Sequence, residues 1–125
     1  MSENEISKLV IGCAIEVHRV LGPGLLESVY EEVLCHELSK ARLAFRRQEQ
    51  VPIRYKEVIL SSPLRLDLIV GDLVIVDLKA TQETTDIDKQ QLLTYLRLRN
   101  LKLGLLINFN VIRLVDGVHR VVNGL

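Results

Sequence analysis

The segment from Leu73 to Lys79 constrains the fold more than any other part of this sequence. It is apolar at every position except Asp77 and Lys79, and valine and isoleucine fill three of its seven positions. A β-branched segment that is apolar on both faces is expected at the centre of a sheet that is covered on both sides. The sequence therefore predicts helices on both faces of a sheet. Asp77 and Lys79, two positions apart, leave the same face of its central strand.

Helical spacing of apolar residues appears on both sides of this strand. It predicts one helix from Ser2 or Asn4 to about Leu21, ended by Gly22-Pro23-Gly24, and a second helix to about Ala41. A third helix is expected from Asp86, as its cap, through about Asn100. The positions expected to face the core are Ile6, Leu9, Val10, Cys13, Val17 and Val20, then Leu26, Val29, Tyr30, Val33, Leu34 and Leu38, and in the third helix Ile87, Leu92, Leu93, Tyr95 and Leu96.

Strand-like segments fill the rest of the chain. One or two basic strands are expected between residues 43 and 60, and residues 64–70 pair with 73–80 across a turn. Residues 103–109 form another buried strand, and 111–115 with 118–122 are expected to form a hairpin that turns at Asp116-Gly117. This order of elements predicts an α/β class, or a mixed-sheet α+β class, with residues 1–125 forming a single domain.

Charge is balanced overall, with 16 basic and 16 acidic residues, but it is distributed in blocks. Residues 38–66 carry seven basic and two acidic side chains, whereas residues 67–91 carry two basic and six acidic ones. Such blocks are typical of solvated faces. They can also gather carboxylates for a cation beside lysines and arginines for phosphates. Composition leaves both interpretations open.

Other features bear on location and partners. Cys13 and Cys35 lie 22 positions apart without a paired metal-binding spacing, so we expect reduced thiols. No apolar run approaches the roughly 20 residues that cross a bilayer, and the acidic start, Met1 to Glu5, does not resemble a secretion signal. A cytoplasmic location is expected. Apolar stripes on the first two helices allow a homodimer face, although such stripes more often belong to the core.

The position of Asp67 relative to Asp77 depends on the turn between their strands. A two-residue loop at Gly71-Asp72 pairs Asp67 with Val76, so the two carboxylates lie on opposite faces. A three-residue loop over residues 71–73, or a single bulge, pairs Asp67 with Asp77 at about 5 Å between Cβ atoms. Two ionised carboxylates at that distance repel unless a divalent cation neutralises them, and Mg²⁺ commonly binds one or two carboxylates.

Five segments match a known family. They are Gly24-Leu25-Leu26-Glu27-Ser28-Val29-Tyr30, Asp67, Asp77-Leu78-Lys79, the helical segment Gln91 to Tyr95, and the late strand Leu105 to Phe109. In these segments, and over nearly its whole length, the chain resembles the small GxxExxY proteins of the PD-(D/E)XK nuclease superfamily. Two positions depart from the family pattern: Asp77 stands where glutamate is usual, and Asn110 follows Phe109 where glycine is common. The superfamily tolerates aspartate at the first of these.

The resemblance implies a restriction-endonuclease-like fold and Mg²⁺-dependent hydrolysis of nucleic-acid phosphodiesters, in DNA more than in RNA, with Mn²⁺ able to substitute. It implies that Glu27, Asp67, Asp77 and the carbonyl of Leu78 bind the metal. Lys79 would orient a water molecule or steady the phosphate, and Gln91 and Tyr95 would position Lys79 or touch the nucleic-acid backbone. The implied catalytic set is therefore Glu27, Asp67, Asp77, Lys79 and Gln91. Candidates for phosphate contacts are Arg46, Arg47, Arg54, Lys56 and Arg97.

Simpler explanations exist for the same residues. Asp77 and Lys79 could form an exposed ion pair that contributes about 0–1 kcal/mol. Glu27 falls in the first turn of the second helix, where the helix dipole would keep it ionised and stabilised. Tyr95 could be a core residue. The alternative functions are a nucleic-acid-binding or assembly module that retains the fold without turnover, and a purely structural protein.

Overall fold

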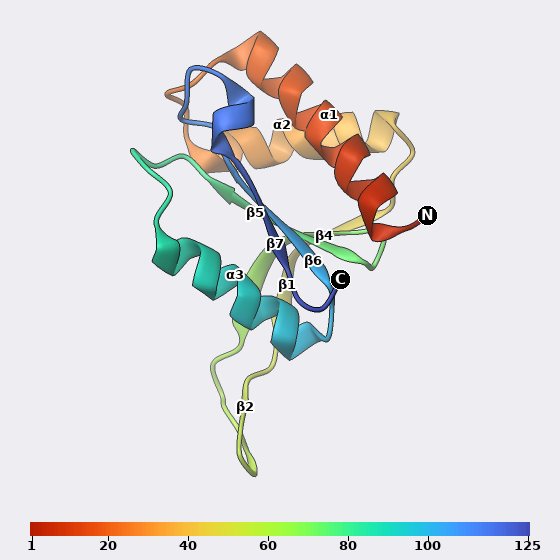
Figure 1. The fold of residues 1–125 in the computed structure, drawn as a ribbon, viewed down its shortest axis with the longest axis vertical. Coiled ribbons are helices and arrows are strands. Elements are labelled where there is room, and N and C mark those ends of the chain that lie inside the picture. Colours follow the sequence, from red (N-terminus) through yellow and green to blue (C-terminus); the bar gives the residue numbers. More distant parts are fainter.

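A five-stranded mixed sheet in the order β1-β4-β5-β6-β7 forms the centre of the computed structural model, which describes residues 1–125. Helices α1 and α2 cover one face of the sheet and α3 covers the other (Figure 1). The predicted α/β class is therefore confirmed. The elements are α1 (Glu3–Leu21), α2 (Glu27–Lys40), β1 (Phe45–Val51), β2 (Arg54–Tyr55), β3 (Val58–Ile59), β4 (Leu64–Val70), β5 (Val74–Lys79), α3 (Asp86–Arg99), β6 (Leu103–Asn108), the 3-10 turn η1 (Leu114–Gly117) and β7 (Val118–Val122).

Strand β5 lies in the middle of the sheet, antiparallel to β4 and parallel to β6. Val74, Val76 and Leu78 contribute to a core of 19 buried residues under α1 and α2, which we call the helix-pair core. Ile75 faces the other way, into a core of seven buried residues under α3, the α3 core. Both faces of β5 are thus covered, as its apolar sequence predicts.

The helix ends follow local capping chemistry. Ser2 and Glu5 form a reciprocal capping box at the start of α1, which confirms Ser2 as the cap. The cap of α3 is Thr85 rather than the predicted Asp86, because the Thr85 hydroxyl accepts a hydrogen bond from the Asp88 backbone while the Asp88 carboxylate accepts one from the Thr85 backbone. Asn100 ends α3 in a left-handed conformation.

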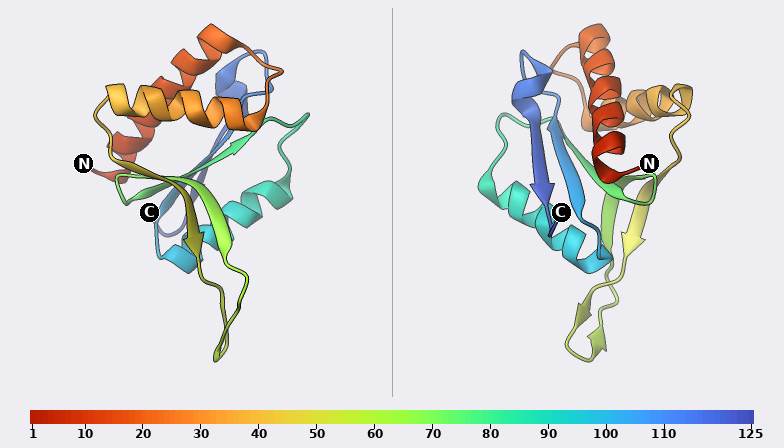
Figure 2. Two further views of the ribbon diagram at one scale, coloured as in Figure 1. Left: turned by 180° about the vertical axis from the view of Figure 1, so that it is seen from behind. Right: turned by 45° about the vertical axis from the view of Figure 1, so that its right-hand side comes forward.

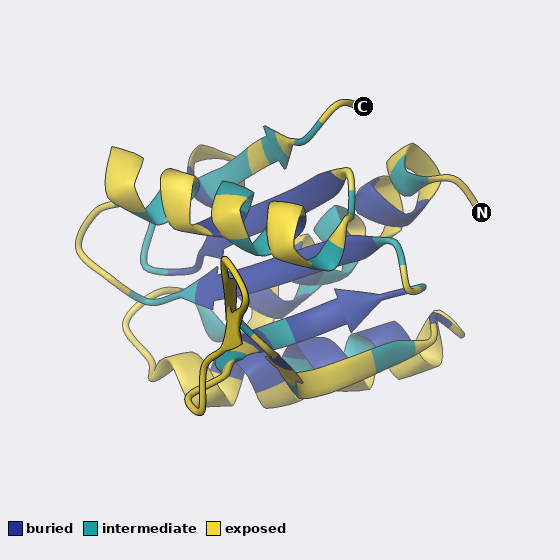
Figure 3. Cartoon of the chain, turned by 90° about the horizontal axis from the view of Figure 1, so that it is seen from below, coloured by how far each residue is buried: buried dark blue, intermediate teal, exposed yellow.

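Several helix positions predicted to be buried are exposed. Each helix contacts the sheet along a narrow stripe, and residues at the margins of the apolar periodicity fall outside it (Figure 3). In α1, for example, Ile6, Val10 and Val17 are buried, whereas residues at the edge of the stripe are not. The residues wrongly assigned to the core are Leu9, Val20, Leu26, Val29 and Ile87, the last of which is 77% exposed.

The predicted hairpin near the carboxyl end is only half correct. Val118–Val122 pairs with β6, but residues 111–113 form no strand and Leu114–Gly117 form a 3-10 turn. The turn buries Leu114 in the helix-pair core, and His18 on α1 hydrogen-bonds the carbonyl of Val111 at 2.7 Å. Packing against α1 therefore overrides the strand preference of this segment.

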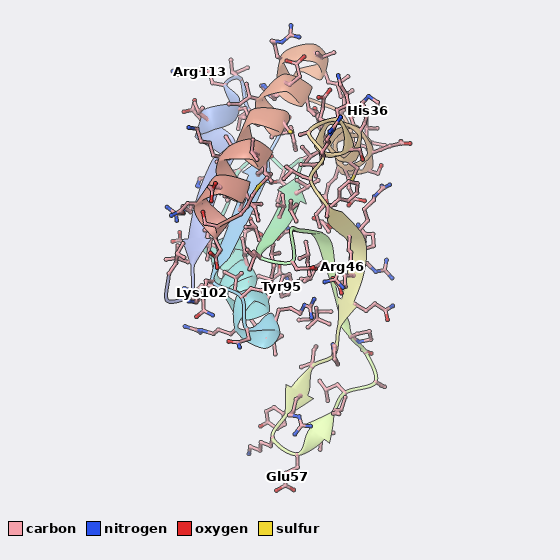
Figure 4. The ribbon with its side chains drawn as sticks, turned by 90° about the vertical axis from the view of Figure 1, so that its right-hand side faces the viewer. His36, Arg46, Glu57, Tyr95, Lys102 and Arg113 are labelled. Atoms are coloured by element: carbon pink, nitrogen blue, oxygen red, sulfur yellow. The ribbon has the colours of Figure 1, made fainter.

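The basic segment predicted between residues 43 and 60 forms β1 and a separate hairpin, β2–β3, which extends away from the body as an arm (Figures 1 and 2). Glu57 lies at its tip (Figure 4). Both cysteines are free, Cys35 buried and Cys13 half-buried. No helix combines the length and the apolar character required to cross a membrane.

Candidate catalytic site

The loop between β4 and β5 settles the relation between Asp67 and Asp77. Val70 pairs with Val74, so the loop has the three residues 71–73. Continuing this register places Asp67 opposite Asp77, which is the arrangement that brings the two carboxyl groups together. Gly71 has a φ of +61°, and a Cβ there would lie 2.6 Å from the end of the Ile6 side chain, so this turn favours glycine.

Asp67 is held at the point where β4 and β5 separate. The paired register between these strands ends at Leu68 and Val76. Beyond it, the Leu78 backbone N–H donates a 2.8 Å hydrogen bond to Oδ2 of Asp67. The Asp67 side chain thus occupies the place that a backbone acceptor of β4 would take in a regular ladder.

Asp77 is buried, with 8% of its surface exposed, and its Oδ2 atom has no hydrogen-bond partner. Burial raises the pKa of Asp77 to about 7, with further contributions from a hydrogen bond to Asp67 and the charges of Asp67 and Glu27, against the opposing charge of Lys79. A buried, unpartnered carboxylate oxygen beside a second carboxylate has the chemistry of a cation ligand. These residues therefore fit a divalent cation.

Glu27 approaches this pair from the first turn of α2. Partial desolvation raises the pKa of its carboxyl group, and the nearby carboxylates of Asp67 and Glu31 raise it further, while Lys79 lowers it. The helix dipole at the start of α2 favours the ionised form of Glu27, whereas desolvation and the neighbouring negative charges act against it.

Helix α3 brings Gln91 and Tyr95 to the same region. Burial, followed by the charge of Asp77, raises the pKa of Tyr95, while a hydrogen bond from Gln91 lowers it. Tyr95 also packs against the α3 core, so it has both a structural contact and a position near the carboxylates. Asp77 shares its face of β5 with Ile75, which belongs to the same core.

The structure brings some of the predicted site residues together and pairs others with different parts of the chain. Asp67 and Asp77 meet, but no three carboxylate, histidine or cysteine side chains form a ready-made ligand cluster. Arg46 is paired with Glu49 and Asp72, and Arg47 with Glu31, so both predicted phosphate contacts are engaged within the chain. The other basic candidates, Arg54, Lys56 and Arg97, form no ion pair.

Three further residues near the site were not singled out from the sequence: Glu31, Gln48 and Asn108. The Asn108 side chain accepts hydrogen bonds from the backbone N–H groups of Thr81 and Asn110 and donates one to the Thr81 carbonyl, so it fixes the loop that follows Lys79. Its signal was available, because it is the polar residue of an otherwise apolar strand. Glu31 is recognisable only as the residue one turn after Glu27, and Gln48 has no local signal.

A mixed sheet covered by helices on both faces, with two aspartates meeting where its central strands separate, defines an α/β protein of the restriction-endonuclease-like type. The family model of the PD-(D/E)XK nuclease superfamily matches residues 4–121. The chain therefore belongs to the PD-(D/E)XK nuclease superfamily. Comparisons with curated proteins and with solved structures gave no match.

Proposed function

We propose that this protein is a divalent-metal-dependent nuclease of the GxxExxY type that hydrolyses nucleic-acid phosphodiester bonds, in DNA more than in RNA. The observation that carries the proposal is the buried Asp77 carboxylate, which faces Asp67 and leaves one oxygen without a partner. Membership of the superfamily supports a phosphodiester substrate.

The donor set for Mg²⁺ or Mn²⁺ comprises Asp67, Asp77 and the Leu78 carbonyl, with Glu27 contributing directly or through water. When bound, the cation acidifies a water molecule and offsets the negative charge that develops on the phosphate. The hydrogen bond from the Leu78 N–H fixes the Asp67 carboxylate, so this ligand needs little reorganisation.

Residues of the chain itself supply the remaining functions. Lys79 leaves the same face as Asp77 and carries a compact positive charge that can steady a phosphate oxygen or orient a water molecule. Gln91 and Tyr95 present an amide and a hydroxyl on one side of α3 and contact Lys79 or the nucleic-acid backbone. We assign catalytic roles to Glu27, Asp67, Asp77, Lys79 and Gln91.

Phosphates farther from the cut are bound by basic side chains with no partner in the chain. Arg54 and Lys56 on the arm, and Arg97 on α3, meet this condition, and Lys56 lies over the Tyr55 ring at 5.3 Å. Arg46 and Arg47, the other proposed phosphate contacts, pair with carboxylates of the protein and would have to exchange these partners for a phosphate.

A plasmid-nicking assay with Mg²⁺ or Mn²⁺ tests this function. We expect the parent to nick supercoiled DNA, and Asp77→Ala and Lys79→Ala to lose this activity. Asp116→Ala, an exposed carboxylate in η1, is the control and should cleave like the parent. Equal cleavage by Asp77→Ala, or no cleavage by the parent over a broad range of conditions, would contradict a catalytic function.

A second candidate is a nucleic-acid-binding or assembly module that retains the fold without turnover. The balanced net charge and the small size of the chain favour it. It predicts salt-sensitive association with nucleic acid, or self-association, without strand breaks. The same assay, run beside a gel-shift measurement, distinguishes the two functions.

A further inference from the structure

At Asp67, strand β4 reverses which of its two faces packs against which core. Residues two positions apart in a regular strand share a face. Leu68 nevertheless belongs to the helix-pair core, whereas Leu66 belongs to the α3 core. The alternation of β4 is therefore broken between these two leucines.

Strand β1 changes face at the same level of the sheet. Phe45 packs against the helix-pair core and Val51 lies in the α3 core, although the even spacing of these residues would place them on one face. Arg47 pairs with Leu68 and Glu49 with Leu66, but the position between them, Gln48 opposite Asp67, is not paired. The two strands thus switch faces together at Gln48 and Asp67.

Gln48 adopts a left-handed conformation, with a φ of +50°, inside a strand. Most residues other than glycine and asparagine avoid this region, so something must hold the glutamine there. Its side-chain amide donates a 2.6 Å hydrogen bond to Oε1 of Glu31. Arg47 donates two hydrogen bonds to Oε2 of the same carboxylate, at 3.2 and 2.9 Å.

The contact of both Arg47 and Gln48 with Glu31 is a further sign that β1 changes face at this point. Side chains of consecutive strand residues point to opposite faces, yet Arg47 and Gln48 both reach Glu31. Glu31 is buried, with 8% of its surface exposed, and lies one helical turn after Glu27 on α2. One carboxylate therefore joins the helix of Glu27 to the strand that pairs with β4 on either side of Asp67.

The switch has a direct effect on Asp67. Because β4 turns at this residue, the Asp67 side chain enters the gap between β4 and β5 and accepts the hydrogen bond from the Leu78 N–H. A regular, extended β1 would pair Gln48 with Asp67 and continue the ladder. The Asp67 carboxylate would then point to one face of the sheet instead of lying between the strands.

We propose that Gln48, anchored by Glu31, is a positioning residue whose left-handed backbone directs the Asp67 carboxylate, already opposite Asp77 by register, toward the Leu78 N–H. The inference rests on the proposed function, because the site that it positions is the proposed metal site. Glu31 extends the same control to α2 and hence to Glu27.

Comparison of Gln48→Gly with Gln48→Val tests this inference. Glycine adopts the left-handed conformation without steric cost, whereas valine favours extended backbone. We expect Gln48→Val to weaken Mn²⁺ binding by about tenfold or more, as loss of an outer-shell partner does at metal sites. Gln48→Gly should stay within about threefold of the parent, because it keeps the backbone conformation that positions Asp67. If position 48 were only a regular strand position, Gln48→Gly would have the larger effect of the two, since valine stabilises strands and glycine weakens them.

Two readouts separate this inference from the proposed function. Mn²⁺ affinity is measured by paramagnetic resonance of the free ion, and hydrogen exchange of the Leu78 amide is measured by NMR without metal. Leu78 should exchange faster in Gln48→Val and remain protected in Gln48→Gly. If the parent binds no Mn²⁺, the proposed metal site fails, while the Leu78 exchange still decides whether Gln48 positions Asp67.

Matched controls complete the experiment. Gln50, on the same strand and regularly paired with Arg65, is substituted by glycine and by valine. The glycine variant should be the less stable of the two, and both should keep the parental protection of the Leu78 amide. If Gln48→Val does not fold, Gln48→Ala takes its place. Alanine removes the side-chain hydrogen bond to Glu31 without introducing a β-branched residue, and this variant should also lose protection of the Leu78 amide. Parental Mn²⁺ affinity and Leu78 protection in Gln48→Val, or in its alanine replacement, would overturn the inference.

Discussion

Asp77 carries a carboxyl group whose burial raises its pKa from an ordinary value near 3.8 to about 7. The folded protein therefore holds this proton more tightly than the unfolded chain. The resulting contribution to the free energy of unfolding is fully present below about pH 4 and is lost as pH rises toward 7. Above pH 7, without metal, the ionised Asp77 is a cost to the folded state.

Asp77→Asn should remove this cost, because the amide is neutral and can donate a hydrogen bond to Asp67. At pH 8 in EDTA we expect the variant to unfold at higher urea concentration than the parent. The rise of the Asp77 pKa from 3.8 to about 7 sets an upper bound of roughly 4 kcal/mol on this gain in the free energy of unfolding. At pH 4, where Asp77 is neutral in the parent, the two free energies of unfolding should converge. A variant that is equally or less stable at pH 8 would contradict the assigned pKa.

Divalent metal should act in the opposite direction and stabilise the parent more than Asp77→Asn. A cation that neutralises Asp67 and Asp77 binds only the folded parent, so Mn²⁺ at 100 times its Kd should stabilise the protein by about 2.7 kcal/mol. Asp77→Asn lacks the ligand charge, and its melting temperature should change much less. Calorimetry with and without 1 mM Mn²⁺ measures the melting temperatures of the parent and of Asp77→Asn. Equal shifts in the two proteins would place the metal elsewhere.

At this scale the sequence predicted the charged residues but not the contacts that hold them. Asp67, Asp77 and Lys79 were recognisable because they interrupt or end apolar strands. The turn length, which brings the two aspartates together, was one of two arrangements that the sequence allowed. Gln48 could not be predicted, because its left-handed conformation depends on a carboxylate 17 positions away.

Among the elements, the end of β6 controls the loop that follows the candidate site. Asn108 has 1% of its surface exposed, and its amide makes three hydrogen bonds to the backbone of Thr81 and Asn110. Asn108→Ala leaves the part-buried backbone N–H groups of Thr81 and Asn110 without this acceptor, so we expect a loss of about 2–4 kcal/mol in the free energy of unfolding. The loop after Lys79 should also exchange its amide hydrogens faster.

Urea denaturation and hydrogen exchange check this prediction. Asn123→Ala is a matched control, because its side chain donates a single hydrogen bond, to the Leu101 carbonyl. We expect that substitution to cost about 1 kcal/mol. Equal losses in the two variants would show that Asn108 has no special role in holding the loop.

Elements were predicted well where local chemistry and burial agree. The first two helices follow from their apolar periodicity, and β5 and the segment 103–109 follow from their nearly continuous apolar character. Residues 111–115 were predicted as a strand because of their valine and isoleucine content, but burying Leu114 against α1 requires a turn there. Contacts between segments that are distant in the sequence determine this turn. The apolar periodicity of a single segment carries no information about such contacts.

At the scale of the whole molecule, charge and shape are unevenly distributed. The basic arm extends from β1 and β4, the strands that meet at Asp67 (Figure 2). Helices α1 and α2 cover the other face, where Lys8 and Lys40 line a groove between them together with Glu5, Glu16 and Glu37. The balanced net charge therefore conceals a basic projection on one part of the molecule and a mixed surface on another.

This distribution predicts where nucleic acid binds. Reversing both arm charges, in Arg54→Glu with Lys56→Glu, should weaken DNA binding and lower the slope of log affinity against log salt concentration by about two, one for each phosphate that is no longer neutralised. Fluorescence anisotropy between 50 and 200 mM salt measures the slope, with EDTA present to prevent cleavage. The control reverses Lys8 and Lys40, and should leave the slope unchanged because these lysines lie away from the arm. Equal effects of the two double variants would mean that binding follows net charge rather than the arm, and a change in oligomeric state without a change in the slope would assign the arm to self-association instead.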